Sequence, residues 1–120
     1  MNTPTFNIGH RDSFEKNGKW SLVRKSLNIK SFGINMVTIP PGDTIPEHTE
    51  VDRDQEELFI ILKGTGTMVI DGKEYDAPEG TYIRLDPELK RTVKNKSSEP
   101  VVVLIVSAPR SSGYVPMDWA

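Results

Sequence analysis

Six side chains that can exchange protons or coordinate a metal lie close together in one stretch, between Gly42 and Gly64. A histidine and five carboxylates fall within ten residues, and an apolar run, Leu58 to Leu62, follows at once. A strand that begins next to imidazole and carboxylate groups can hold them on a rigid wall, as metal sites and acid–base sites require. The alternative is a solvated acidic loop, because runs of charge usually face water. The six residues are His48, Glu50, Asp52, Asp54, Glu56 and Glu57.

Length and composition predict one globular domain, residues 1–120. The chain is 36% hydrophobic and 27% charged, which is ordinary for a folded protein with one core. A net charge of −2 gives no strong field for nucleic acid. The longest apolar run, Val101 to Val106, is far shorter than the roughly 20 residues that cross a membrane. The absence of cysteine excludes disulfides and thiolate ligands, and we expect a cytoplasmic protein.

Short alternating or apolar runs, separated by turn residues, predict about eight strands and no long helix. The strongest turn signal is Asp71-Gly72, since both residues tolerate the positive φ angles of a type I′ hairpin. Strands at such even spacing are typical of a closed barrel or a β-sandwich. The runs cover residues 20–25, 32–39, 58–62, 67–70, 73–75, 81–85, 91–95 and 101–107.

The two ends of the chain flank this barrel region, residues 20–107. Residues 1–19 are polar and broken by proline and glycine, which predicts an irregular lead-in with one helical turn near residues 12–16. Residues 108–120 form an irregular tail that contains four apolar residues. We expect this tail to pack on the barrel or on a partner subunit. The apolar residues are Tyr114, Val115, Met117 and Trp119.

The spacing of the acidic stretch resembles the first motif of the cupins, a family of small β-barrel proteins. That motif runs glycine, five residues, His-x-His, three or four residues, glutamate, six residues and glycine. Gly42, His48 and Glu50 match its front, with glutamate in place of the second histidine. Glu57 and Gly64 match its back.

A second stretch resembles the other cupin motif, which runs glycine, five residues, Pro-x-Gly, two residues, histidine, three residues and asparagine. Gly80, Asp86-x-Glu88, Arg91 and Asn95 keep every interval, with arginine at the histidine position. The resemblance covers roughly residues 33–107. It implies an all-β fold, the cupin double-stranded β-helix, which is a small jelly-roll-like barrel with little helix.

The resemblance also implies where a metal would lie. In a typical cupin, two histidines and the glutamate of the first motif, with the histidine of the second, hold one divalent ion. The corresponding set here is His48, Glu50 and Glu57. The loop before Glu57 is about two residues longer than the motif, so another gap placement puts Glu50 and Asp52 on the histidine positions and leaves His48 outside.

Arg91 changes the chemistry that this site can perform. Arginine stays protonated and cannot coordinate a metal. At 4 Å and an effective dielectric near 20, its charge repels a divalent ion by about 8 kcal/mol. We therefore favour a metal-free cavity in which Arg91 pairs with Glu57 and binds an anion. The alternative is a single Mn, Fe, Ni or Zn ion on His48, Glu50 or Asp52, and Glu57.

Strand periodicity predicts which residues line the cavity, because side chains alternate between the two faces of a strand. If Glu57 points inward, Phe59 and Ile61 do too, and Val93 and Asn95 follow Arg91 in the same way. For the strand over residues 32–39 the pattern does not choose between its two faces. One face carries Ile34, Met36 and Thr38, and the other carries Asn35, Val37 and Ile39.

Three functions fit these residues. The favoured one is the binding of a small polar or anionic metabolite inside the barrel, with His48 as a candidate base. The second is a metal-dependent cupin enzyme, namely an oxygenase, isomerase or lyase. The third is a structural protein in which Arg91 and Glu57 form a plain internal ion pair. The second apolar face of the strand over residues 58–62 needs cover, so we also expect a homodimer.

Overall fold

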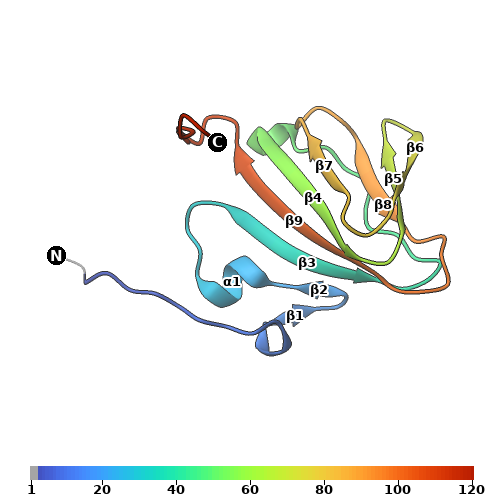
Figure 1. Ribbon diagram of the computed structural model, residues 1–120, viewed down its shortest axis with the longest axis horizontal. Coiled ribbons are helices and arrows are strands. Elements are labelled where there is room, and N and C mark those ends of the chain that lie inside the picture. Colours follow the sequence, from blue (N-terminus) through green and yellow to red (C-terminus); the bar gives the residue numbers. More distant parts are fainter. Residues whose placement is uncertain (1–2) are drawn as a thin grey trace.

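The computed structural model describes residues 3–120, most of whose regular structure is β-strand (Figure 1). The first two residues of the predicted lead-in lie outside this range. No helix within it is long and apolar enough to span a membrane. The elements are η1 (Arg11–Ser13), β1 (Lys16–Asn17), β2 (Trp20–Ser21), α1 (Val23–Leu27), β3 (Gly33–Ile39), η2 (Val51–Arg53), β4 (Gln55–Lys63), β5 (Gly66–Ile70), β6 (Lys73–Ala77), β7 (Tyr82–Leu85), β8 (Arg91–Lys94) and β9 (Val101–Pro109).

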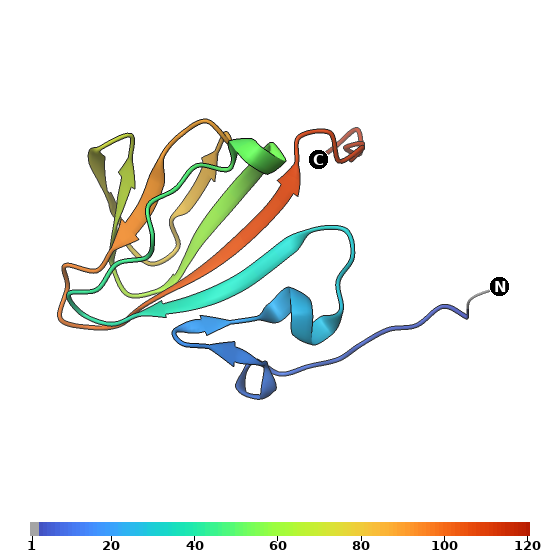
Figure 2. The same cartoon turned by 180° about the vertical axis from the view of Figure 1, so that it is seen from behind.

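Two antiparallel sheets enclose one core (Figures 1 and 2). The larger has the order β1-β2-β3-β9-β4-β7, and the smaller has the order β6-β5-β8. Two isolated bridges, Thr44 to Lys94 and His48 to Arg91, lay the chain after β3 alongside β8. The acidic stretch therefore enters the fold as an extra edge on the smaller sheet. The all-β architecture predicted from the sequence is confirmed.

The core is built by the alternation of side chains along the strands. On β3, Val37 and Ile39 face inward and are fully buried, so their face of the strand turns toward the core. On β4, Phe59 and Ile61 are buried in the same way. Buried side chains from both sheets complete this core, among them Met68, Val93, Val101 and Val103.

The outer face of the larger sheet is also apolar, although less buried. Leu58 pairs with Val106 and Ile60 with Leu104 across β4 and β9, and these residues are half-buried. Leu62, further along β4, is 44% exposed. A homodimer would use this face, and the dimer stays a prediction.

The strand predicted over residues 20–25 is wrong beyond its first two residues. Only β2 is extended there, and Val23–Leu27 forms α1 instead. An alternation over six residues is too short to separate a strand from one helical turn, and Arg24, Lys25 and Leu27 are good helix formers. The helix buries Val23 and ends at Asn28, whose left-handed φ of 56° terminates it.

Strands β4 and β9 are longer than the sequence suggested. β4 starts at Gln55, so Glu57 lies inside a strand and its side chain has a fixed direction. β9 continues to Pro109. Beyond it, the apolar side chains of the tail do not pack on the barrel, since Tyr114 and Trp119 are 75% and 84% exposed. Their packing on a partner subunit stays a prediction.

Gly64 should be the glycine on which the fold depends most, because two constraints coincide there. Its φ is +80°, and a Cβ would lie 2.5 Å from the backbone oxygen of Pro100. We predict that Gly64→Ala lowers the free energy of unfolding by about 2–5 kcal/mol. Gly72→Ala, at a φ of +82° with open space around it, should cost about 1–2 kcal/mol. Urea unfolding of both variants checks this, and equal losses would contradict it.

Candidate functional site

The bridge between the acidic stretch and β8 places His48 opposite Arg91. The backbone N–H of His48 donates to the Arg91 carbonyl at 3.1 Å, and the Arg91 N–H donates to the His48 carbonyl at 2.9 Å. Glu57 reaches the same place from β4, which belongs to the larger sheet. The backbone bridge between His48 and Arg91 and the contact between Arg91 and Glu57 therefore bring these three residues together.

Arg91 lies behind Glu57, fully buried. Its Nη1 donates to Glu57 Oε1 at 2.9 Å, and its Nη2 donates to the Asp86 carbonyl at 2.6 Å. Its Nε is the only buried side-chain nitrogen or oxygen within residues 3–120 that has no hydrogen-bond partner. With 0% of its side chain exposed, Arg91 has no surface with which to clamp a ligand directly. It instead supplies a fixed positive charge beneath Glu57.

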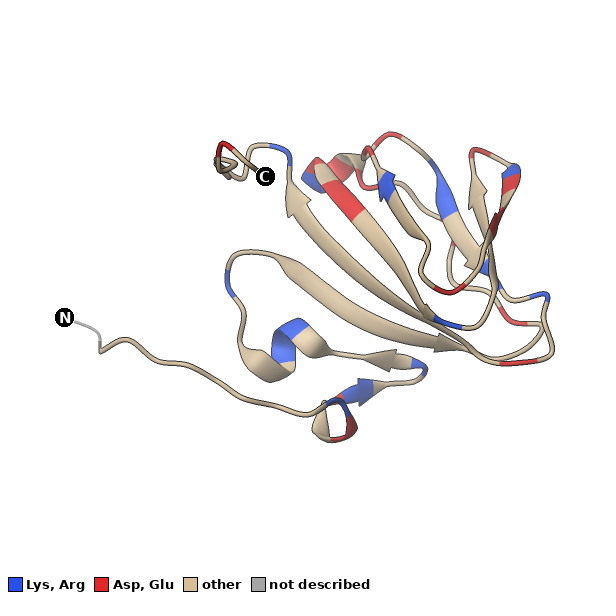
Figure 3. Ribbon diagram, in the orientation of Figure 1, with Lys and Arg blue, Asp and Glu red and all other residues tan. Residues whose placement is uncertain are grey.

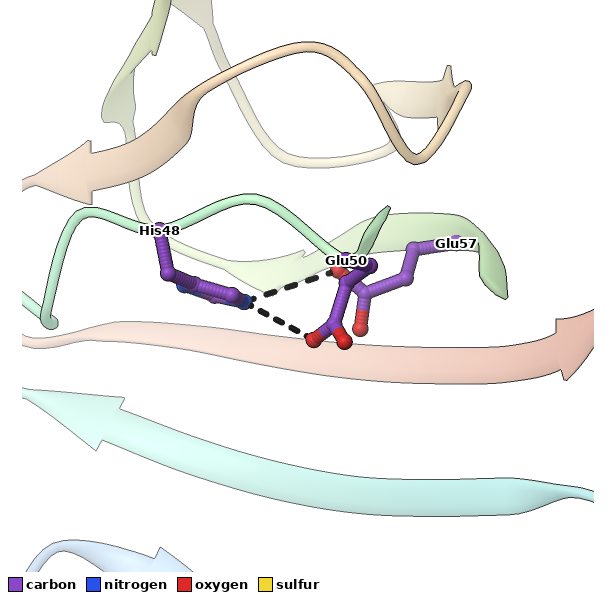
Figure 4. Close-up of side chains that lie close together, drawn as sticks. All are labelled: His48, Glu50 and Glu57. Atoms are coloured by element: carbon purple, nitrogen blue, oxygen red, sulfur yellow. Dashed lines mark hydrogen bonds and ion pairs between the residues drawn. The ribbon is translucent and has the colours of Figure 1, made fainter. Parts of the chain in front are cut away.

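His48, Glu50 and Glu57 converge on one point (Figure 4). His48 Nε2 lies 3.1 Å from Glu50 Oε1 and 3.9 Å from Glu57 Oε1, and Nδ1 lies 3.1 Å from the Pro46 carbonyl. One ligand atom from each of the three residues lies within 4.8 Å of the others, so the three form a candidate metal site. Asp52, the alternative ligand from the sequence, lies in η2 and is exposed.

The electrostatics of Glu57 reflect both its burial and its neighbours. Desolvation raises the pKa of this carboxyl above its ordinary value, and repulsion from Glu50 raises it further. The positive charges of Arg91 and His48 oppose the rise in pKa without cancelling it. Glu57 therefore accepts a proton more readily than an ordinary glutamate, and its ionised form attracts a cation.

A cavity of about 670 Å³ opens in front of these groups. Its lining includes His48, Glu50 and Glu57, together with Phe59 from β4 and Trp20 from β2. Trp20 was not predicted as a cavity residue, although its alternation with Ser21 was visible. Arg24 and Arg53 were missed because α1 and η2 were not predicted. Of the two faces of β3 that the sequence left open, one contributes Asn35 to the cavity and the other Ile34.

Besides Arg91, which was predicted to bind an anion, three residues predicted to bind ligand lie in the core instead of the cavity wall. Ile61 and Val93 are at most 1% exposed and pack among apolar side chains. Asn95 donates from Nδ2 to the carbonyls of Ile39 and Glu99, at 2.8 and 2.7 Å. Its geometry is that of a residue that holds the loop after β8.

The wall of the cavity is fastened to the end of β9 through Arg110. Its side chain reaches both Asp54, which ends η2, and Glu88, with Nη2 lying 2.9 Å from Glu88 Oε1. Its backbone N–H also donates to the Asp54 carbonyl at 3.0 Å. Because Glu50 precedes η2 and Arg53 is its last residue, the contact of Arg110 with Asp54 restrains both relative to the cavity.

Comparison with known proteins assigns the family. Residues 35–107 match the family described as Cupin domain, which is more than half of the chain. This protein belongs to the cupins.

Relatives agree with that assignment. An uncharacterised protein of Methanocaldococcus jannaschii is 26% identical over 97 residues, which is 80% of this chain and 81% of the relative. A cupin protein from Bacteroides fragilis superposes with a TM-score of 0.80 at 21% identity, over 96% of this chain and 93% of that one. A sugar phosphate isomerase of the cupin superfamily from Silicibacter pomeroyi gives a TM-score of 0.69 at 18% identity, over 88% and 75%. At such identities the structural likeness shows the fold alone.

Within the cupin frame, two of the positions that the resemblance assigned to metal ligands now have defined roles. Glu50, at the second histidine position, lies beside His48 and Glu57, so the gap placement that left His48 outside is not the one the fold uses. Arg91, at the last histidine position, points behind Glu57 instead of into the cavity.

The buried ion pair gives a strong stability prediction. Arg91→Met leaves Glu57 without its partner and should cost about 3–5 kcal/mol of unfolding free energy. Replacing both residues with apolar ones, as in Arg91→Met with Glu57→Leu, should cost less than the sum of the two single changes. Arg84→Met, which removes an exposed guanidinium paired with Glu56 and Asp86, should stay within about 1 kcal/mol. Additive losses in denaturant unfolding would refute the coupling.

The raised pKa of Glu57 predicts a pH dependence of stability. The pKa of Glu57 in the folded protein lies above the ordinary value of 4.5, so the folded protein binds this proton more tightly than the unfolded chain does. The contribution of Glu57 to the free energy of unfolding therefore falls as pH rises from 4.5 through the folded pKa. Glu50→Gln removes a repulsive charge, so it should lower the pKa of Glu57 and make the fall smaller. Carboxyl ¹³C NMR titration of Glu57 measures this, with Asp52→Asn as the control. An unchanged midpoint in Glu50→Gln would contradict the assignment.

Proposed function

We propose that this cupin binds a small polar or anionic metabolite in the inner cavity, in contact with His48 and Glu57. The proposal rests on the convergence of His48, Glu50 and Glu57 on one open cavity, which also has the apolar side chains of Trp20, Phe59 and Ile105 in its lining. Convergent polar groups beside apolar and aromatic side chains are typical of small-molecule sites. His48, with 40% of its side chain exposed, is placed to exchange a proton with the ligand.

The charges favour a site that works without a metal. Arg91 and a protonated His48 would supply two positive charges against the two negative charges of Glu50 and Glu57. In that form both ring nitrogens of His48 donate, one to the Pro46 carbonyl and one to Glu50, and every contact of the ring is satisfied.

A second candidate, a metal-dependent cupin enzyme, is favoured by the same ring. A neutral imidazole has a single N–H, yet both nitrogens of His48 face groups that only accept. If Nδ1 donates to Pro46, the lone pair of Nε2 points at two carboxylates, and a cation between them would remove the conflict. His48, Glu50 and Glu57 would hold such an ion, which would polarise a ligand oxygen as a Lewis acid. Isomerase, lyase or oxygenase chemistry would then become accessible.

Thermal shift with a panel of small polar metabolites tests the binding proposal. A compound at about 100 times its dissociation constant should stabilise the protein by about 2.7 kcal/mol, which is several degrees in Tm. We expect the shift to be lost in His48→Ala and in Glu57→Gln and kept in Asp52→Asn. A shift that survives in both cavity variants would contradict the proposal.

Metal analysis of the purified protein separates the two candidates. In the metal-free case, dialysis against Mn²⁺, Fe²⁺, Ni²⁺ or Zn²⁺ leaves no stoichiometric ion and chelators do not change ligand affinity. Stoichiometric metal that disappears in Glu50→Gln but not in Asp52→Asn would establish the second candidate instead.

A further inference from the structure

The rim of the cavity carries three basic side chains from three separate segments. Arg24 comes from α1, Lys30 from the connection to β3 and Arg53 from η2, and all three line the cavity. On the ribbon, α1, this connection and η2 each carry a blue segment that marks basic residues (Figure 3). Among residues 3–120 none of them forms a salt bridge, whereas Lys25 pairs with Glu15 and Arg110 with Asp54. No carboxylate of the described residues therefore pairs directly with these three cations.

These basic groups make the cavity electrically polarised along its depth. Glu57 is buried and Glu50 half-buried, whereas Arg24, Lys30 and Arg53 are exposed, so the carboxylates form the inner wall and the cations the rim. A ligand that is anionic at one end and carries uncharged hydroxyl or carbonyl groups at the other fits this arrangement in one orientation. Arg24 is already held at the rim, because its Nη1 donates to the Ile29 carbonyl at 3.1 Å. Four of its five N–H groups remain for a ligand.

We propose that the rim formed by Arg24, Lys30 and Arg53 binds the phosphate of a small hydroxylated phosphate monoester. The proposal rests on the function proposed above and names its ligand class. A carboxylate is a single negative charge that one guanidinium satisfies with two parallel hydrogen bonds. A phosphate monoester carries a charge of about −1.5 to −2 on three acceptor oxygens, which matches three cations that approach from different segments.

Titration with inorganic phosphate, followed by ¹⁵N–¹H NMR, tests the rim by itself. We expect phosphate to shift the amide signals of α1 and η2, and to bind about tenfold more weakly in Arg53→Ala and in Arg24→Ala. A charge-assisted hydrogen bond is worth about 1.5–3 kcal/mol, which is a tenfold change or more. Lys25→Ala is the matched control, since Lys25 is adjacent to Arg24 but does not line the cavity. Phosphate that shifts no signal, or that binds all four proteins equally, would overturn the proposal.

A second titration separates this proposal from the proposed function. Glucose 6-phosphate should bind at least about tenfold more tightly than glucose, and added salt should reduce the difference. Equal affinities for the two sugars would overturn the rim and leave cavity binding in place. Glu57→Gln should weaken glucose 6-phosphate but leave inorganic phosphate unchanged. If Glu57→Gln affects neither probe while Arg53→Ala weakens both, the rim stands and the inner-wall function fails.

Discussion

The structure depends on a buried ion pair, Arg91 with Glu57, that joins its two sheets. Taking two charges out of water costs several kcal/mol for each ion, and attraction offsets this only where the geometry is good and other hydrogen bonds are made. Arg91 meets these conditions in part, through Glu57 and the Asp86 carbonyl, and leaves its Nε without a partner. The pair fixes the direction of Glu57, and through Glu57 it sets the charge at the inner wall of the cavity.

Around this pair the cupin frame is kept while its ligand set is altered. Glu50 replaces an imidazole with a carboxylate, and Arg91 replaces another with a cation that points away from the cavity. The result is a wall with one imidazole, two carboxylates and a buried positive charge, facing a rim of unpaired basic groups. Whether the wall holds a proton or a metal ion decides if the cavity binds its ligand or transforms it. Both cases use the same three side chains.

Much of this could be predicted from the sequence, and the exceptions have physical reasons. The even spacing of short strands predicted a barrel or a β-sandwich. The intervals from Gly42 to Gly64 and from Gly80 to Asn95 resemble the two cupin motifs, and that resemblance implied the cupin barrel. The partnership of Arg91 and Glu57 also followed from their positions. Spacing could not show that the guanidinium lies behind the carboxylate, because that depends on side-chain packing. The helix over Val23–Leu27 was missed, since six residues fit both periods, and the cationic rim was missed with it.

A crystal structure of the purified protein would show both the buried ion pair and the contents of the cavity. We expect Arg91 to be sealed in the core with its Nη1 on Glu57, and water or a small molecule to lie in the cavity beside His48. Electron density for a fully occupied metal ion between His48, Glu50 and Glu57, with the Arg91 side chain turned out into solvent, would contradict it.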